Sequence, residues 1–539
     1  MNTLYYGDNL DILRRYIKDE TVDLVYLDPP FKSNQDYNVL FAEKDGTRAA
    51  AQIKAFEDTW QWDQEAARAY HEIVETGPER VSKVMQAFMT FLGGSGDTAS
   101  DMMAYLAMMS PRLVELHRVL KLTGGIYLHC DSTASHYLKL LMDSIFRPEN
   151  FRNEIIWKRT HAHSDSKQGA RHYGRVTDTL LFYSKGPEPK WNPQYVPYGQ
   201  EYLDRDYRRT DSDGRRYRID NLQGPGGAAK GNPQYEVMGV TRYWRYSKEH
   251  MDELIRQGRV IQTRPGAVPQ YKRYLDEMPG VPTQNLWDDL PPINNRSKEL
   301  LGYPTQKPEA LLERIIKTGT DEGNLVLDPF CGCGTAIAVA ERLKRNWIGI
   351  DITHLAIGLV RRRLLDAFGD AVQFEIKGEP ISLPDAEKLA REEPYQFQSW
   401  ALGLIGARHA ELKKGADKGI DGHLYFHDEP KTTKQVVISV KGGHLLAQHV
   451  RDLRGVIERE KAAIGVLITM QEPTHPMRAE AASAGFYEAP WGRKYARLQL
   501  LTVAELLAGK TLDFPRENVT FKKAPKAKAE TPADETLPF

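Results

Sequence analysis

The sequence predicts an α/β protein in which one open, mixed sheet forms a large domain and a second, smaller α/β domain follows it. Two apolar runs, 22–27 and 325–327, have the length of buried strands, and each stops abruptly at an aspartate, Asp28 or Asp328. Similar runs alternate with amphipathic helical patterns before and after these positions, and again after residue 394. Ligands of open α/β sheets bind at the carboxyl ends of strands, so the two aspartates predict a site for two ligands.

The large sheet is expected to come from two separate stretches, residues 1–186 and 303–377. Residues 1–36 have the pattern strand, helix, strand, and residues 40–110 carry apolar side chains at helical spacing, which predicts a helical insertion. The other strands expected in the first stretch are 126–130, 154–157 and 179–183. The elements expected in the second stretch are a helix at 309–318, a strand at 325–327, a helix at 335–345 and a strand at 347–350.

The remaining residues divide by composition. Residues 187–302 lose apolar periodicity and gain Pro, Gly, Tyr and Arg, which is typical of an irregular inserted region. The polar stretch 378–393 is expected to be a linker. A compact α/β domain is expected over 394–515, and the tail 516–539, rich in Lys, Ala and Pro, is expected to be disordered.

Charge and cysteine content narrow the class of protein. Lys plus Arg and Asp plus Glu both number 73 in a chain of 539 residues, so any basic surface must be local. The 3 cysteines are too few for a disulfide framework and suit a reducing compartment. The first residues lack the basic start and apolar stretch of a signal peptide, and no run reaches the ~18 apolar residues of a membrane helix. A cytoplasmic protein without membrane contact is therefore expected.

The candidate cofactor site is the Gly-rich turn that follows strand 325–327. Gly332 and Gly334 lack a Cβ, so the backbone can turn tightly and approach a ligand closely. The helix expected from Thr335 would point its free N–H groups at that ligand. Asp351 ends the next strand, where nucleotide-binding folds place the carboxylate that accepts ribose hydroxyls. The structural alternative is an ordinary strand–turn–helix unit with a capping aspartate.

Taken together, the two motifs resemble those of the DNA amino-methyltransferases. Asp28-Pro29-Pro30-Phe31 resembles the target-base motif of that family, and the run from Asp328 to Thr335 (Asp-Pro-Phe-Cys-Gly-Cys-Gly-Thr) resembles its loop for S-adenosyl-L-methionine. The order of the motifs, catalytic first, resembles the β class, and the resemblance implies a Rossmann-like methyltransferase sheet. The residues that it assigns to the cofactor are Asp8, Lys307, Asp328, Phe330, Gly332, Gly334, Thr335 and Asp351.

Two of these assignments have specific roles and alternatives. Lys307, in Thr305-Gln306-Lys307-Pro308, would meet the methionine carboxylate of the cofactor, and its alternative is a helix-starting Lys-Pro without a ligand. Asp8 resembles the acidic position of the family near the cofactor adenine, but a Gly-Asp turn or a helix N-cap has the same pattern.

The resemblance also assigns the catalytic residues Asp28, Pro29, Pro30 and Phe31 to the target base. The carboxylate of Asp28 and the carbonyl of Pro29 can each accept one hydrogen of an exocyclic amine, while the two prolines stiffen the turn and offer no N–H. The ring of Phe31 can stack on a flipped base and offset much of the cost of flipping. Asp at the first position resembles the adenine-N6 enzymes, and cytosine-N4 remains the alternative.

The inserted region 187–302 resembles a target-recognition region by its position, which implies double-stranded DNA as a partner. The candidate DNA-binding residues are Arg208, Arg209, Arg215, Arg216 and Arg218. Tyrosines lie between these arginines, and arginines and aromatic rings can contact phosphates and bases. Acidic residues nearly balance the charge, so a solvated irregular subdomain is the alternative.

The C-terminal domain resembles Mrr-like restriction-endonuclease domains. Asp421 stands where such domains hold Mg²⁺, and Lys441 where they orient the attacking water. Ser439, however, replaces the usual acid or Gln, and a neutral hydroxyl is a poor ligand for Mg²⁺. Glu411 has no assigned place. An active nuclease and a degenerate binding module are both consistent with this pattern.

The combined expectation is a DNA methyltransferase in a restriction–modification or phage-defence setting, with a second copy or a partner subunit as further candidates for interaction. Two rivals remain open. One is a single-chain restriction–modification enzyme in which the C-terminal domain cuts DNA, and the other is a DNA-binding protein with an inactive methyltransferase fold.

Overall fold

The computed structural model describes residues 2–30, 62, 64–93, 97–160, 171–294, 297, 299–301, 303, 305–410, 419–429 and 432–515. Phe31, Glu411, part of the expected 40–110 insertion and the whole tail 516–539 lie outside the described residues. The chain divides into two compact units. One combines Met1–Trp191 with Asn285–Phe539, and the other is Asn192–Gln284.

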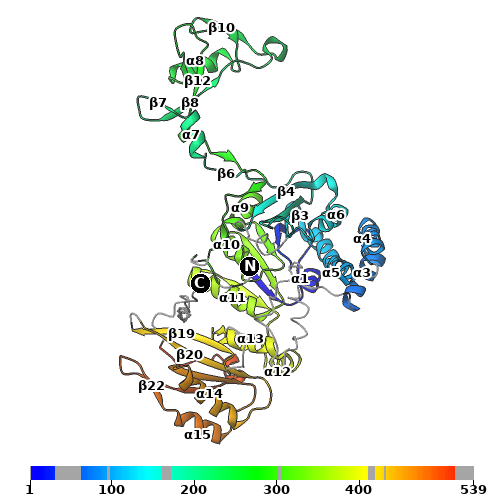
Figure 1. The fold of residues 1–539 in the computed structure, drawn as a ribbon, viewed down its shortest axis with the longest axis vertical. Helices are drawn as coiled ribbons and strands as arrows, with labels where there is room; N and C mark the ends of the chain where they lie inside the picture. The colour runs from blue at the N-terminus through cyan, green and yellow to red at the C-terminus, as the bar shows by residue number, and fades with distance from the viewer. Residues whose placement is uncertain are drawn as a thin grey trace, which may run out of the picture. The chain divides into compact units, whose positions relative to one another are not determined.

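A nine-stranded mixed sheet forms the centre of the first unit, in the order β14-β4-β5-β3-β2-β15-β16-β1-β17. From one edge to the other the strands are β14 (Leu286–Trp287), β4 (Phe151–Lys158), β5 (Thr177–Ser184), β3 (Leu120–Cys130), β2 (Val22–Leu27), β15 (Leu325–Asp328), β16 (Asn346–Asp351), β1 (Asn2–Tyr6) and β17 (Phe374–Lys377). Only the pairs β3–β5 and β4–β5 are antiparallel. The fold is therefore the predicted α/β class, and both predicted stretches contribute to one sheet (Figure 1).

The register brings the two sequence motifs together. β2 pairs in parallel with β15, with Leu24 beside Val326 and Val25 beside Leu327. Both strands run in the same direction, so their carboxyl ends lie side by side at one edge of the sheet. Asp28 and the Gly-rich loop thus leave neighbouring strands.

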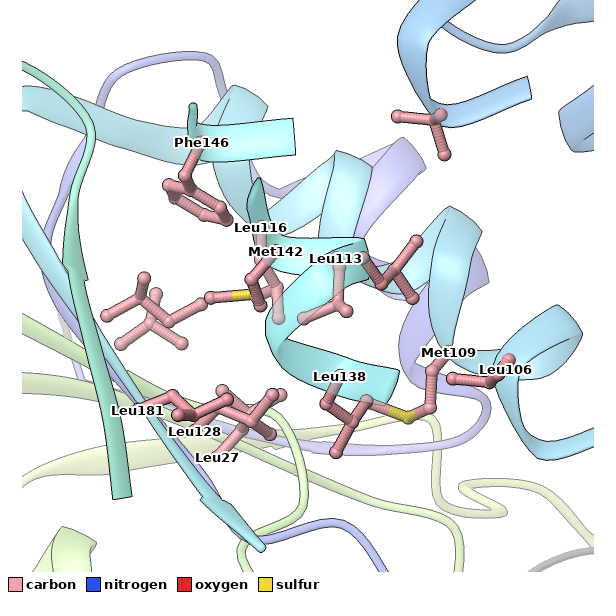
Figure 2. Packing of buried hydrophobic residues seen from close by; sticks show 14 of the residues in the cluster. Leu27, Leu106, Met109, Leu113, Leu116, Leu128, Leu138, Met142, Phe146 and Leu181 are labelled. Atoms are coloured by element: carbon pink, nitrogen blue, oxygen red, sulfur yellow. The ribbon is translucent and has the colours of Figure 1, made fainter. Parts of the chain in front are cut away.

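One face of the sheet is covered by α1 (Asn9–Tyr16), α5 (Asp97–Val119) and α6 (Ser135–Phe146), together with α3 (Gln64–Thr76) and α4 (Glu79–Leu92) of the predicted insertion. Figure 2 shows Leu27, Leu128 and Leu181 of three strands facing the apolar side chains of α5 and α6. Side chains alternate along a strand, so the neighbouring residues Tyr26 and Tyr127 face the opposite side. There they pack with α9 (Glu309–Gly319), α10 (Thr335–Arg342) and α11 (His354–Phe368).

The C-terminal part of the first unit contains a separate five-stranded sheet in the order β18-β19-β20-β21-β24. Its strands are β18 (Arg408–His409), β19 (Gly422–Glu429), β20 (Thr432–Lys441), β21 (Ile464–Thr469) and β24 (Leu498–Thr502). Its helices and added hairpin are α13 (Pro394–Leu404), α14 (Ala447–Arg459), α15 (His475–Ser483), α16 (Val503–Leu507), β22 (Phe486–Glu488) and β23 (Lys494–Ala496). This is the predicted second, smaller α/β domain.

The stretch 378–393, expected as a linker, differs from that expectation. It contains α12 (Leu383–Glu392), which Ser382 caps by accepting a hydrogen bond from the backbone N–H of Asp385. Ala386 is fully buried in the core of the C-terminal domain, and Leu383 and Leu389 pack against that core. The sequence predicted a polar linker because the few apolar residues of this helix, although spaced along one face, stand among many charged residues.

The second unit, Asn192–Gln284, has a small core of its own around the fully buried Trp244. Its main sheet has the order β11-β12-β8-β7, from β11 (Val260–Ile261), β12 (Gln270–Tyr274), β8 (Arg216–Asn221) and β7 (Arg209–Thr210). The other elements are β6 (Tyr195–Val196), α7 (Gln200–Asp206), β9 (Gln234–Val237), β10 (Val240–Tyr243), α8 (Lys248–Arg256) and β13 (Val281–Pro282). The unit falls inside the predicted inserted region 187–302 but is shorter than predicted, because β14 (Leu286–Trp287) pairs with β4 and belongs to the sheet of the first unit. Among the described helices of the whole chain, none combines the length and the apolar character needed to cross a membrane.

Candidate active site

Asp28 is the first residue after β2, and its side chain is only 15% exposed. Its Oδ2 lies 2.5 Å from Nζ of Lys307, whose side chain is 13% exposed. Pro29 is buried and Pro30 is partly buried, so the turn is held close to the sheet. The position of Phe31, predicted to stack on the base, lies outside the described residues.

The ion pair gives Lys307 a partner that the sequence did not predict. Lys307 was expected to meet the carboxylate of a cofactor, and in the structure its ammonium instead joins the Thr305–Pro308 segment to the end of β2. A short ion pair with little exposure restrains both side chains, because leaving either charge alone in this setting is unfavourable. The cofactor role of Lys307 stays a prediction.

The Gly-rich loop has the backbone conformation that only glycine adopts easily. Gly332 and Gly334 have φ values of 48° and 72°, both in the left-handed region. A Cβ on Gly334 would lie 2.7 Å from Cγ2 of Val360, and one on Gly332 would lie 3.2 Å from the ring of Tyr303. Gly334 is the N-cap of α10, which begins at Thr335 as predicted. The loop therefore presents the amino end of a helix at the carboxyl end of β15.

Asp351 stabilises this loop from the next strand. Its Oδ2 accepts a hydrogen bond from the backbone N–H of Gly332 at 2.9 Å, and its Oδ1 accepts two from Thr353, from the N–H and the hydroxyl, both at 2.9 Å. Burial raises the pKa of Asp351, and these hydrogen bonds work in the opposite direction. Asp351 thus has a structural role in the loop besides the ribose contact predicted for it.

Asp328 and Phe330 begin the loop on its buried side. Asp328 is 3% exposed and accepts a hydrogen bond from the N–H of Phe330 at 3.1 Å. Burial raises the pKa of Asp328 well above its usual range, since little solvent reaches the carboxylate. The ring of Phe330 packs against the core beneath the sheet. Both residues shape the loop from below.

Asp8 is the N-cap of α1, which was one of the alternatives for this position. Its Oδ1 accepts hydrogen bonds from the N–H groups of Leu10 and Asp11, and its Oδ2 lies 2.6 Å from Nη2 of Arg112. The neighbouring Asn9 donates to the carbonyl of Pro329 at 2.8 Å and accepts from Nε of Arg112 at 2.6 Å. Asp8 and Asn9 therefore tie the end of β1 to the start of the Gly-rich loop.

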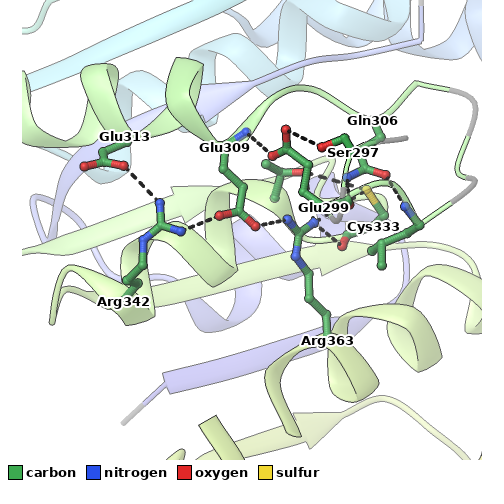
Figure 3. Close-up of polar contacts among 10 residues, drawn as sticks. Ser297, Glu299, Gln306, Glu309, Glu313, Cys333, Arg342 and Arg363 are labelled. Atoms are coloured by element: carbon green, nitrogen blue, oxygen red, sulfur yellow. Dashed lines mark hydrogen bonds and ion pairs between the residues drawn. The ribbon is translucent and has the colours of Figure 1, made fainter. Parts of the chain in front are cut away.

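A network on the opposite side of the loop was not predicted from the sequence (Figure 3). Arg363 of α11 donates to the carbonyl of Cys333 at 3.2 Å and to the hydroxyl of Thr335 at 3.1 Å, and it pairs with Glu309 at 2.7 Å. Glu309 also pairs with Arg342. Burial alone would raise the pKa of Glu309, but the two arginines outweigh it and the pKa is lowered. Three helices thus hold the loop through charged side chains.

The segment before α9 joins the same network. Glu299 accepts from the N–H of Glu309 at 3.0 Å, and its carbonyl accepts from Gln306 at 2.6 Å. The side chain of Gln306 also accepts from the N–H of Leu301 at 2.8 Å. These contacts fix the backbone on both sides of Lys307. A Gln directly before the candidate lysine was the only signal of this arrangement in the sequence.

In the Asn192–Gln284 unit, three of the five candidate DNA-binding arginines make contacts within the unit. Arg215 pairs with Asp276 at 2.8 Å and Glu277 at 2.7 Å, and these contacts raise its pKa. Arg216 donates to two backbone carbonyls, both at 2.9 Å, and Arg218 donates to the hydroxyl of Tyr202 at 2.7 Å. Their role in DNA binding stays a prediction, and each has a structural role as well.

The other two candidates differ from these. Arg208 is exposed in the turn before β7, and Arg209 lies in β7 opposite Tyr217 and is partly buried. Arg208 is therefore the candidate whose side chain is most available to a partner.

In the C-terminal domain two of the three candidate nuclease residues, Asp421 and Ser439, are in contact. Oδ2 of Asp421 accepts from the hydroxyl of Ser439 at 3.1 Å and from the N–H of Val440 at 2.7 Å. Lys441 is the last residue of β20. Within the described part of the chain, no group of three or more His, Cys, Asp or Glu side chains could hold a metal ion. A carboxylate whose Oδ2 already receives two hydrogen bonds, one of them from a neutral hydroxyl that is a poor ligand, is a weak site for Mg²⁺ among the described residues.

Two family models match the chain. Residues 22–360 match a model described as DNA methylase, of the N6/N4 type. Residues 394–508 match one described as NACHT-associated inactive Restriction Endonuclease 1. The C-terminal domain is thus similar to restriction endonucleases, as predicted, and the model that it matches is described as inactive.

Three curated proteins illustrate the likeness. The Type II methyltransferase M.EcaI of Enterobacter cloacae is 31% identical over 263 residues, which are 48% of this chain and 57% of that protein. The Type III restriction-modification enzyme StyLTI Mod subunit of Salmonella typhimurium is 27% identical over 351 residues, 62% of this chain and 49% of that subunit. The DNA adenine methyltransferase YhdJ of Escherichia coli is 23% identical over 362 residues, 67% of this chain and 82% of that enzyme.

This chain spans about half the length of the first two relatives. The match to the DNA methylase model, in contrast, extends over more than half of this chain and includes both strand ends of the candidate site. The chain therefore belongs to the N6/N4 DNA methylase family.

Proposed function

We propose that this chain is a site-specific DNA methyltransferase, which transfers a methyl group from S-adenosyl-L-methionine to the exocyclic N6 amine of a flipped adenine. The observation that carries the proposal is the pairing of β2 with β15. The pairing brings a carboxylate followed by two prolines beside a glycine loop that leads into a helix, and this arrangement supports a base site next to a cofactor site. The name of YhdJ, a DNA adenine methyltransferase, supports adenine.

The residues around the loop fit the cofactor. The left-handed glycines keep side chains away from the turn, and the amino end of α10 offers unpaired N–H groups. Gly332, Gly334 and Thr335 would hold the cofactor from the loop, while Asp351 would accept its ribose hydroxyls through lone pairs that the loop does not use. When bound, the cofactor would supply an activated methyl group.

Asp28 and Pro29 would act on the amine. An exocyclic amine conjugated to a base ring is a weak nucleophile, and two acceptors at its hydrogens localise the nitrogen lone pair. Asp28 would accept one hydrogen and the carbonyl of Pro29 the other. Lys307 would hold the Asp28 carboxylate in place, because its ammonium already contacts Oδ2. As the new N–C bond forms and the sulfur–carbon bond of the methyl donor breaks, the thioether product would keep the electron pair of that bond. The amine would lose one proton to the carboxylate of Asp28, which would pass it to solvent.

We further propose that the C-terminal domain does not cut DNA and acts as a binding module. The hydrogen bonds from Ser439 and Val440 to Asp421 support this, as does the word inactive in the name of the matching family. The spacing of Asp421, Ser439 and Lys441 supports an Mrr-like origin. A restriction–modification setting and a partner subunit are supported by the names of the relatives, one of which is a Mod subunit.

The experiment that tests the proposal is methyl transfer in solution. Purified protein is incubated with unmethylated bacterial DNA and S-adenosyl-L-methionine that carries a tritiated methyl group, and the nucleosides are then separated. We expect label in N6-methyl-2′-deoxyadenosine. Label in N4-methyl-2′-deoxycytidine would refute the choice of base, and no label in DNA, with the cofactor shown to be bound, would refute the activity.

A further inference from the structure

Three buried polar side chains form a hydrogen-bonded chain beneath the candidate active site. The hydroxyl of Tyr26 lies 3.1 Å from Nδ1 of His129, and Nε2 of His129 lies 3.1 Å from Oδ2 of Asp178. Tyr26 is 3% exposed, His129 0% and Asp178 7%. At its outer end, Oδ1 of Asp178 lies 3.0 Å from Nε of Arg159. The mechanism proposed above uses none of these residues.

The register of the strands places this chain directly beside Asp28. Tyr26 and Asp28 are two residues apart, so both side chains project from the same face of the sheet. Tyr26 is paired with Tyr127 on β3. His129, two residues after Tyr127, therefore lies on that face at the level of Asp28. Asp178 extends the chain to β5, and so three strand ends are connected.

The charge on Asp178 sets the direction of its hydrogen bond with His129. Burial raises the pKa of Asp178, but the hydrogen bond from His129, the electrostatic interaction with His129 and the charges of Lys307 and Arg159 outweigh it, so the pKa is lowered. An ionised carboxylate can only accept, so Nε2 of His129 carries a hydrogen. Nδ1 of the same ring forms the hydrogen bond with the hydroxyl of Tyr26. The chain thus connects Tyr26 to the carboxylate of Asp178 through one imidazole ring.

The energetics suggest a purpose other than stability. Burying a hydroxyl, an imidazole and a carboxylate is unfavourable unless each is satisfied, and apolar side chains would fill the same space at lower cost. A fully satisfied buried network has the advantage of a defined geometry. Here that geometry is imposed where β2 ends.

We propose that Tyr26, His129 and Asp178 are positioning residues, which fix the carboxyl end of β2 laterally and so hold the Asp28 carboxylate in register with the target amine. The proposal rests on the function proposed above. It adds that the distance between Asp28 and the cofactor loop depends on β3 and β5, in addition to the ion pair with Lys307.

The test uses the full-length protein with Tyr26→Phe and Asp178→Asn, which remove one hydroxyl and one charge without changing side-chain size. Tyr127→Phe is the matched control, because Tyr127 lies beside Tyr26 on the same face, is 2% exposed and is outside the chain. Three quantities are measured: the single-turnover rate of methyl transfer, the cofactor Kd by calorimetry, and hydrogen exchange of backbone amides in residues 22–30.

We expect the first two variants to lower the single-turnover rate by about 10- to 100-fold, since misplacing a reacting group by a fraction of an ångström has effects of that size. Their cofactor Kd stays at the wild-type value, and exchange at the end of β2 becomes faster. Tyr127→Phe changes none of the three quantities.

The other outcomes decide against the proposal. Wild-type rate and exchange in both chain variants would refute it, and so would an equal loss in Tyr127→Phe, which would indicate general destabilisation. A slower rate with unchanged exchange would assign the chain a direct chemical role instead. If the wild-type protein transfers no methyl group, the proposed function fails, and exchange alone decides whether the chain fixes β2.

Discussion

Asp28→Asn is the substitution that tests the proposed chemistry most sharply. The amide has the size of the carboxylate and can still accept a hydrogen bond from Lys307, but it loses the negative charge that localises the lone pair of the amine. Losing one positioned polar group in a water-poor site costs about 2.7–4 kcal/mol in the transition state, by analogy with an oxyanion hole. The expected result is a methyl-transfer rate about 100- to 1000-fold lower.

The structure offers a matched control on the same strand. Asp23, near the amino end of β2, has a side chain that is 13% exposed and pairs with Lys121 at 2.8 Å. Asp23→Asn therefore removes a charge of similar exposure, at the end of the strand remote from the site. Asp23 also accepts a hydrogen bond from the N–H of Leu325 at 2.8 Å, and its partner Lys121 is 40% exposed, so the destabilisation of each variant is measured separately.

The assay is single-turnover methyl transfer with saturating cofactor, together with calorimetry of cofactor binding and thermal unfolding. We expect Asp28→Asn to bind the cofactor but to transfer the methyl group about 100- to 1000-fold more slowly, and Asp23→Asn to do both as the wild type does. Normal turnover in Asp28→Asn would remove Asp28 from the chemistry. An equal loss of activity in Asp23→Asn would show that the effect is one of stability.

Three further predictions concern the loop, the inserted unit and the C-terminal domain. Gly334→Ala should destabilise the protein by about 1–3 kcal/mol and weaken cofactor binding in calorimetry, because a φ of 72° and the contact with Val360 oppose a Cβ. The control Gly358→Ala lies in a helix where a Cβ would meet open space, and it should neither destabilise the protein nor weaken cofactor binding. Arg208→Glu should lower the affinity for DNA and the slope of its salt dependence without changing the Tm, and an unchanged salt slope would place the DNA contact elsewhere. Arg215→Glu should lower the Tm, because it breaks the contacts to Asp276 and Glu277. The wild-type protein should not cleave unmethylated DNA with Mg²⁺, and Ser439→Glu should create Mg²⁺ binding that calorimetry detects. If the wild type does cleave DNA with Mg²⁺, and Asp421→Ala and Lys441→Ala each abolish that cleavage, the chain is a single-chain restriction–modification enzyme.

The sequence was sufficient for those parts of the fold that depend on local patterns. Strands β2, β15 and β16 are apolar runs ended by aspartates, and α10 begins at Thr335 as predicted. Glycine at positions 332 and 334 correctly indicated a tight turn, because few other residues adopt a positive φ. The alternation of apolar strand patterns with amphipathic helix patterns likewise predicted the two-domain α/β organisation.

Contacts between residues far apart in the chain could not be predicted from the sequence. The pairs Lys307–Asp28 and Arg112–Asp8 join positions far apart in the chain, and no local pattern indicates which charges meet. The same holds for Arg215, whose acidic partners Asp276 and Glu277 follow the neighbouring strand β12, 61 and 62 positions later in the chain. The many arginines between 205 and 218 predicted a surface that binds DNA. In the structure, Arg215, Arg216 and Arg218 also make contacts within the unit.

Modified-base sequencing of genomic DNA gives the most direct test of the central claim. The wild-type chain and Asp28→Asn are each expressed in a host that lacks DNA methylation, and the host genome is sequenced with detection of modified bases. The account predicts N6-methyladenine at one recurring sequence motif with the wild type and a much smaller modified fraction at that motif with Asp28→Asn. An unmodified genome with soluble wild-type protein, or the same modification with Asp28→Asn, would contradict it.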